Sequence, residues 1–161
     1  MQHTKLNNIL NEIRHSFDFL FARRCRIGHT ELRNGATWVV TLRSNDFNVH
    51  STSDRLNISL AATDNREKNW FELFEIVYFV SNKKDFIGVY EDDGEYKDAA
   101  SYRVEQLQRF ATILRKYLGE ITEFFTAEPV RNFEKLLSIR KEARELYSKA
   151  LNEKLSRMNL P

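Results

Sequence analysis

The chain has 161 residues, a net charge of +2, 42% hydrophobic residues and 12% aromatic residues. This length fits one domain, and the composition excludes a disordered protein, which needs low hydrophobicity and a large net charge. Cys25 is the only cysteine, which excludes an intramolecular disulfide. The N-terminus is polar, and no stretch approaches the roughly 18 to 20 apolar residues of a membrane span. We therefore predict a cytoplasmic protein, with no membrane contact, that forms one α+β domain over residues 1–161.

The first predicted element is an amphipathic helix over residues 5–21. Its apolar residues recur at helical spacing and form one stripe: Leu6, Ile9, Leu10, Ile13, Phe17, Leu20 and Phe21. Thr4 stands directly before this run and is a plausible N-cap.

A β-hairpin is predicted next, because Asn34-Gly35 separates two strands at 26–33 and 36–43. This pair tolerates the positive φ angles of a two-residue hairpin turn. In that register Glu31 and His29 share the sheet face of Trp38. The polar start of the first strand indicates a sheet edge.

Two more strands follow, because residues 47–51 and 56–60 alternate between apolar and polar side chains. The sum is a four-stranded antiparallel meander that is apolar on one face. Helices must cover that face.

Residues 66–81 have strand-like composition but are predicted to be helical. A strand would place Glu72 and Glu75 on opposite faces, whereas a helix places them on one side together with Lys68 and Phe79. A short strand is predicted for residues 85–90 and an acidic turn for residues 91–94.

Two long helices, at 102–125 and 130–158, are predicted to complete the chain as a hairpin packed on the sheet. The first has a heptad seam beside a second apolar stripe, and such a wide apolar arc implies packing on more than one side. Pro129 separates the helices and can start the second. Residues 1–98 are thus the helix and sheet portion, and residues 99–161 the helical hairpin portion. An alternative is that these C-terminal helices pair with those of a second copy and form a homodimer.

No catalytic or metal-binding motif is present. The four histidines lack the spacing of a metal site, and there is no Gly-rich phosphate loop. Cys25 lies among arginines that can lower a thiol pKa, although a lone cysteine is more often inert. We expect no cofactor, no metal and no catalytic residues. An enzyme with an unfamiliar site around Cys25, His29, Glu31 and His50 is the third alternative.

The charge is unevenly distributed along the chain. Residues 63–128 carry nine Lys or Arg against fourteen Asp or Glu, with the acids concentrated at 85–98. Such a block is usually a solvated loop, but exposed aromatic residues rimmed by acids are also typical anchors for a protein partner. The candidate binding residues are Trp70, Glu72, Glu75, Phe79, Asp92, Asp93 and Glu95.

The favoured function is therefore a non-enzymatic protein-binding module. The alternative is a nucleic-acid-associated protein that uses Arg23, Arg24, Arg26 and Arg33 or the basic helix 130–158. No nucleic-acid-binding module is recognisable, which makes this alternative the weaker one.

Four short motifs carry a resemblance to a known group of proteins: Ser53-Asp54-Arg55, Trp70-Phe71-Glu72-Leu73, Gln106-Leu107-Gln108-Arg109 and Leu114-Arg115-Lys116-Tyr117. In this order they resemble small bacterial α+β proteins, some of them immunity proteins of polymorphic toxin systems. The resemblance covers about half of the chain. It implies a cytoplasmic protein that occludes a toxin and performs no chemistry of its own.

Overall fold

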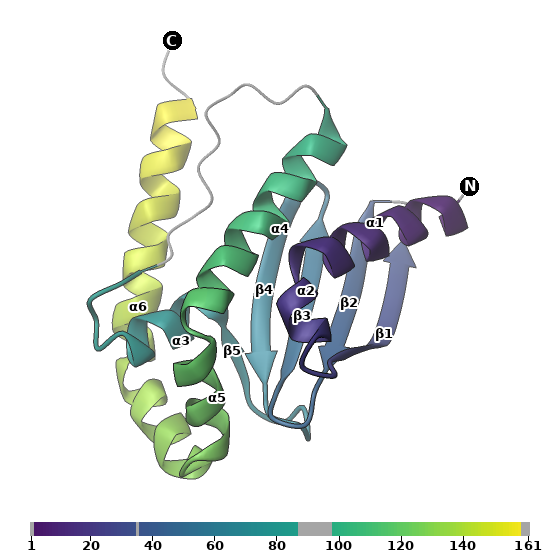
Figure 1. The fold of residues 1–161 in the computed structure, drawn as a ribbon. Coiled ribbons are helices and arrows are strands. Elements are labelled where there is room, and N and C mark those ends of the chain that lie inside the picture. Colours follow the sequence, from purple (N-terminus) through teal and green to yellow (C-terminus); the bar gives the residue numbers. More distant parts are fainter. Residues whose placement is uncertain (1, 35, 87–97, 159–161) are drawn as a thin grey trace.

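The computed structural model describes residues 2–34, 36–86 and 98–158, and it has the predicted α+β architecture. The elements, in chain order, are α1 (Gln2–Ser16), α2 (Asp18–Phe21), β1 (Arg26–Arg33), β2 (Thr37–Arg43), β3 (Asn48–Asp54), β4 (Asn57–Thr63), β5 (Trp70–Glu72), α3 (Leu73–Val80), α4 (Ala99–Lys116), α5 (Leu118–Thr126) and α6 (Pro129–Met158) (Figure 1). The predicted first helix is divided at Phe17 into α1 and α2.

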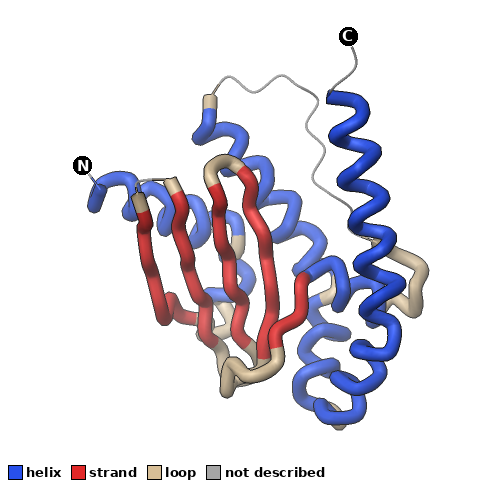
Figure 2. Tube along the Cα trace, turned by 180° about the vertical axis from the view of Figure 1, so that it is seen from behind, coloured by secondary structure: helices blue, strands red, loops and turns tan. Residues whose placement is uncertain are grey.

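The five strands form one antiparallel sheet in the order β1-β2-β3-β4-β5. The predicted meander is confirmed as β1 to β4, with β1 at an edge, and the short strand β5 extends it. Helices α1 and α4 lie across one face of the sheet (Figure 1). Seen from behind, no described helix covers the other face (Figure 2). The fold therefore has two layers, and we call the uncovered side the open sheet face.

The predicted register of the first hairpin is wrong. Arg33 pairs with Thr37, so the loop has three residues. Glu31 therefore pairs with Val39, and His29 pairs with Thr41. Because side chains alternate along a strand, one additional loop residue moves the side chains of residues 29–33 to the other face. Glu31 and His29 therefore lie on the open sheet face and not on the face of Trp38.

A β-bulge at Gly28 interrupts this register between Ile27 and His29. Ile27 still lies opposite Leu42, as predicted. A Cβ atom at Gly28 would lie 2.6 Å from the Cδ atom of Arg43, so glycine leaves the space in which the Arg43 side chain crosses the strand.

The core lies between the sheet and the helices. Trp38, Val40 and Leu42 of β2 are buried, as are Ile58 and Leu60 of β4. They pack in one cluster with buried residues of α1 and α4: Ile9, Ile13, Leu107, Ala111 and Leu114. The predicted apolar face of the sheet is therefore the face that the helices cover.

Residues 66–81 contain both a strand and a helix. Residues 70–72 pair with β4, where Trp70 lies opposite Thr63 and Phe71 opposite Ala62, and only residues 73–80 are helical. The prediction of one helix is wrong for the first part, because the open edge of β4 supplies hydrogen-bonding partners that local sequence does not reveal. Glu72 thus precedes α3 and does not share a helical side with Glu75.

The predicted helix 102–125 is divided at Tyr117 into α4 and α5. Helix α4 contacts α1 and β4, whereas α5 contacts α3 and α6. The wide apolar arc therefore packs on both sides, as predicted, but the two sides belong to two helices. Pro129 begins α6, which contacts α3 and α5.

The predicted strand and acidic turn at 85–94 fall mostly outside the described residues. None of the described helices combines the length and the apolar character needed to cross a bilayer.

Candidate functional site

The open sheet face carries mainly polar side chains. His29, Thr41 and His50 form a row across three neighbouring strands, because His29 pairs with Thr41 and Thr41 with His50. An antiparallel sheet can keep one such face in water. At the β5 end of this face stands Trp70, whose side chain is 38% exposed.

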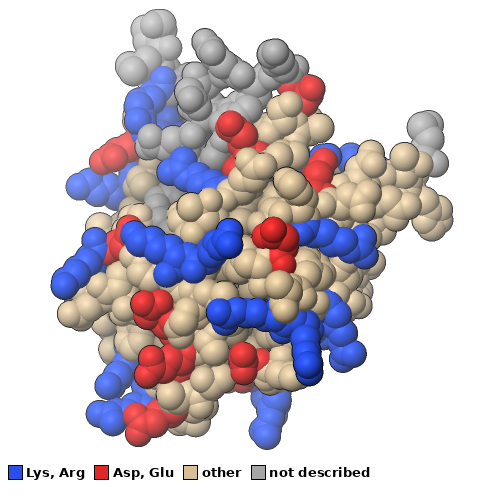
Figure 3. Space-filling model, viewed as in Figure 1, with Lys and Arg blue, Asp and Glu red and all other residues tan. Residues whose placement is uncertain are grey.

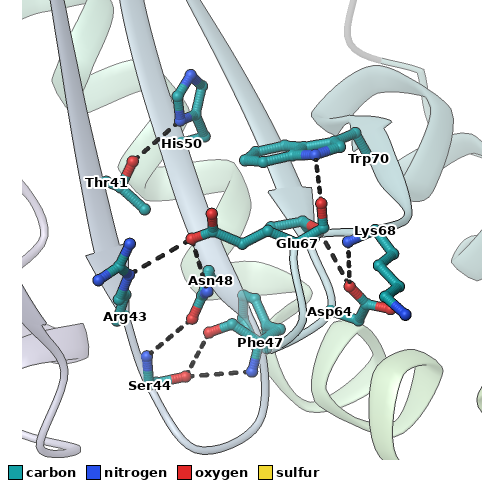
Figure 4. A network of polar contacts seen from close by, with 11 residues as sticks. Thr41, Arg43, Ser44, Phe47, Asn48, His50, Asp64, Glu67, Lys68 and Trp70 are labelled. Atoms are coloured by element: carbon teal, nitrogen blue, oxygen red, sulfur yellow. Dashed lines mark hydrogen bonds and ion pairs between the residues drawn. The ribbon is translucent and has the colours of Figure 1, made fainter. Parts of the chain in front are cut away.

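His50 joins this row to Trp70. Its Nδ1 atom lies 3.0 Å from Oγ1 of Thr41, and its ring lies edge-on to the Trp70 ring with the centroids 4.8 Å apart (Figure 4). The Trp70 indole N–H donates to the backbone carbonyl of Glu67 at 2.9 Å. Burial lowers the pKa of His50, so the imidazole is neutral near pH 7.

The loop between β4 and β5 fixes Trp70 in this position. The Asp64 carboxylate accepts a hydrogen bond from the backbone N–H of Lys68 at 2.9 Å. Oε1 of Glu67 accepts hydrogen bonds from Nδ2 of Asn48 at 3.2 Å and from Nε of Arg43 at 3.4 Å (Figure 4). The Asp64 and Glu67 carboxylates are therefore both held by hydrogen bonds within the loop and the neighbouring strands.

A second polar centre joins the sheet to α6. The Glu75 side chain is 1% exposed, and its carboxylate accepts hydrogen bonds from Nε of Arg140 at 3.2 Å and Nε of Arg144 at 2.7 Å. Arg140 also donates through Nη2 to the backbone carbonyl of Trp70 at 3.0 Å, and its guanidinium lies 5.2 Å from the centre of the Phe71 ring. Because a buried carboxylate needs such partners, this centre fixes α6 beside β5 and α3.

The predicted binding residues occupy different environments. Trp70 is exposed, and Glu72 is half-buried, so that burial raises its pKa. Glu75 is buried, and Phe79 packs on Phe124 with ring centroids 5.4 Å apart. Glu75 and Phe79 therefore do not belong to an exposed acidic and aromatic surface. The other three candidates, Asp92, Asp93 and Glu95, lie outside the described residues.

The structure separates Cys25 from the other residues of the enzyme hypothesis. Nε2 of His29 lies 3.7 Å from Oε2 of Glu31 on the open sheet face, where His50 also lies. Cys25 is buried in the core, and burial raises its thiol pKa to about 11, whereas His29 and Glu31 lie on the open sheet face. A thiol of this pKa is not a nucleophile near pH 7. Within residues 2–34, 36–86 and 98–158, no group of three or more His, Cys, Asp or Glu residues could hold a metal ion.

Three arginines of the predicted basic segments pair with neighbouring acids. Arg33 binds Glu31 at 2.7 Å, and both Arg140 and Arg144 bind Glu75. On the helical side of the molecule, acidic and basic side chains are interspersed among the described residues (Figure 3). On this side, the described residues do not form the clustered basic footprint that is typical of nucleic-acid binding.

Sequence reasoning missed the exposed side of α6. Five exposed residues of this helix recur at alternating spacings of four and three and therefore lie on one side: Leu137, Lys141, Arg144, Ser148 and Leu151. We call this stripe the α6 face. The 3-4 spacing is visible in the sequence, but only the structure shows that the side with Leu136 and Ala143 is the one that packs on the domain.

Comparisons with known proteins leave the site to be interpreted from its geometry alone. No family model, no curated protein and no solved structure was found to match the chain.

Proposed function

We propose that this protein is a non-enzymatic protein-binding module that recognises its partner through the α6 face. One observation carries the proposal. Six large hydrophobic side chains among the described residues are exposed, and four of them lie on α6: Val130, Leu137, Leu146 and Leu151. At 3.6 residues per turn, Val130, Leu137 and Leu151 share one side of the helix, whereas Leu146 lies on the side opposite Leu137. Exposed apolar side chains gathered on one element mark an interaction site, whereas isolated ones need no explanation.

The geometry of α6 suits this role. Its 30 residues span about 45 Å. Among the side chains of α6 that the structure describes, the buried ones, Phe133, Leu136 and Ala143, lie in the first half. Tyr147 lies in the second half of α6 and contacts the domain by stacking on Phe74, with ring centroids 4.4 Å apart. The exposed stripe continues beyond it to Leu151. Leu137 and Leu151 are 14 residues apart, so both can serve as anchors on one side of the helix.

The buried Glu75 centre supports the proposal because it holds this stripe in place. Arg144 belongs to the α6 face and binds Glu75 through Nε at 2.7 Å, while its side chain stays 57% exposed. The helix is therefore pre-organised, which reduces the entropy lost on binding. Lys141 and Arg144 make the centre of the face basic, so we expect an acidic surface on the partner.

The partner class follows from the resemblance rather than from geometry. A resemblance to immunity proteins, for which the comparisons give no support, implies a toxin as the partner. A cytoplasmic location stays a prediction.

Photo-crosslinking in the native host tests the proposal. Benzoylphenylalanine is placed at Leu137 or Leu151, and at the exposed Asn11 of α1 as a control. We expect the same protein adduct from both α6 positions and not from the control. A second substitution, Leu137→Asp in the Leu151 probe protein and Leu151→Asp in the Leu137 probe protein, should remove the adduct without lowering the melting temperature.

Other adducts would change the conclusion. An adduct between two copies of the chain would identify the homodimer, and a nucleic-acid adduct would favour the alternative function. If positions 137 and 151 give no adduct that position 11 lacks, the α6 face is not a binding surface and the proposal is wrong.

A further inference from the structure

A cleft of about 220 Å³ lies on the helical side of the sheet, at the end where α1 and α4 begin. Its floor contains Trp38 and Ile58, which are buried, and its rim contains the exposed Leu56. Three cations line it, each from a different part of the chain: Lys5 of α1, Arg55 of the β3–β4 turn and Arg103 of α4. No acidic residue is among its described lining residues.

We propose that this cleft binds a small organic anion, a carboxylate with a short apolar or aromatic body. The apolar body contacts the Trp38 and Ile58 floor, and the carboxylate lies at the rim among Lys5, Arg55 and Arg103. Guanidinium groups match the planar carboxylate and bind it through paired hydrogen bonds. The volume is below the roughly 300–1,000 Å³ of pockets for drug-sized molecules, so the ligand is small.

The turn that carries Arg55 is held in place from two sides. Oγ of Ser53 donates to the backbone carbonyl of Arg55 at 3.1 Å. Nε2 of Gln106 donates to the carbonyl of Leu56 at 2.7 Å, and Oε1 of Gln106 accepts from the N–H of Ile58 at 3.0 Å. The rim is therefore ordered before a ligand arrives, which lowers the cost of binding.

Arg103 is fixed as well. Its Nε and Nη2 atoms donate to the Glu12 carboxylate at 2.5 and 2.8 Å, and both side chains are largely buried. Glu12 compensates part of the Arg103 charge, and Asp98, which caps α4 by accepting from the N–H of Ser101 at 2.7 Å, adds a second nearby acid. Neither acid lines the cleft. Nη1 of Arg103 takes part in neither bond to Glu12 and can donate to a ligand.

The two tryptophans of the chain allow a direct test. Trp70→Phe leaves Trp38, in the floor of the cleft, as the only tryptophan. Benzoate is then titrated while Trp38 fluorescence is recorded, with calorimetry on the native chain as an independent measurement. Benzamide, which has the same shape without the charge, and inorganic phosphate, which has charge without an apolar body, are titrated in parallel.

We expect a saturable change in Trp38 fluorescence with benzoate. Benzamide and phosphate should bind at least about tenfold more weakly than benzoate. Arg55→Gln should weaken benzoate binding by about tenfold, and Arg23→Gln, a matched change at an exposed arginine outside the cleft, should leave it unchanged. Melting temperatures show whether each variant is folded.

Three results would overturn the inference. They are the absence of saturable benzoate binding up to its solubility limit, equal binding of benzamide or phosphate, and an unchanged affinity in Arg55→Gln. If Arg55→Gln failed to fold, Lys5→Gln in the same titration would decide, because Lys5 is an exposed residue of α1. The test is independent of the α6 face, whose residues do not line this cleft.

Discussion

Oε1 of Gln106 accepts a hydrogen bond from the backbone N–H of Ile58, which lies 48 residues earlier in the chain, at 3.0 Å. The same amide donates to the carbonyl of Leu56. One buried side chain of α4 therefore satisfies both backbone groups of a sheet turn, and it ties the helical layer to the sheet by polar contacts as well as by packing.

Gln106→Leu should destabilise the protein. The substitution keeps a similar volume but leaves the N–H of Ile58 and the carbonyl of Leu56 without their partner. The cost is about 1–3 kcal/mol for the buried N–H of Ile58 and less for the carbonyl of the exposed Leu56, which water can reach. Urea denaturation measures the loss. Gln108→Leu, at an exposed position two residues along α4, is the control and should change stability little. Equal effects of the two substitutions would show that the hydrogen bonds of Gln106 do not stabilise the turn.

Leu114→Ala should cost roughly 2–5 kcal/mol, because Leu114 is fully buried in the core and its truncation leaves a cavity. This is a large part of the roughly 5–15 kcal/mol of a typical domain. Leu137→Ala is the matched control, since that side chain is 52% exposed, and it should leave the unfolding midpoint almost unchanged. A Leu114→Ala protein as stable as the wild type would contradict the packing of α4 described above.

His50 should make stability depend on pH. Burial lowers the pKa of His50 below 6.5. The charge of Glu67 acts in the opposite direction, whereas His29 lowers the pKa further. The unfolded chain therefore takes up a proton more readily, so the contribution of neutral His50 is complete above about pH 6.5 and is lost as the pH falls. Between about pH 7.5 and 5 the wild type should lose more stability than His50→Gln.

Denaturation curves at several pH values measure this difference. His3→Gln, at an exposed histidine of α1, is the control and should follow the wild type. Parallel curves for the wild type and His50→Gln would contradict the prediction.

Cys25 should be unreactive in the folded protein. Burial raises the pKa of its thiol to about 11, so little thiolate forms at pH 8, and the side chain lies in the core. With a disulfide reagent such as Ellman's reagent, we expect modification at least about tenfold slower in native buffer than in denaturant. Modification as fast as that of free glutathione would show that Cys25 is accessible and would reopen a role in chemistry.

Local patterns were sufficient where neighbouring residues decide the structure. Alternation in β2 and β4 predicted the buried face with Val40 and Leu60, and the 3-4 spacing predicted that Leu107 and Leu114 belong to the core of a helix. Pro129 marked the start of α6 because proline is favoured at the first position of a helix.

Long-range contacts decided the rest. Periodicity predicted a helix through Glu72, but pairing with β4 drew residues 70–72 into the sheet. A loop longer by one residue moved His29 and Glu31 to the open sheet face. Burial of Glu75 between Arg140 and Arg144 spans 65 or more residues of sequence. The sequence by itself determined which residues are apolar and how they repeat. Only the tertiary structure decided which polar groups face water, because that depends on the element packed against them.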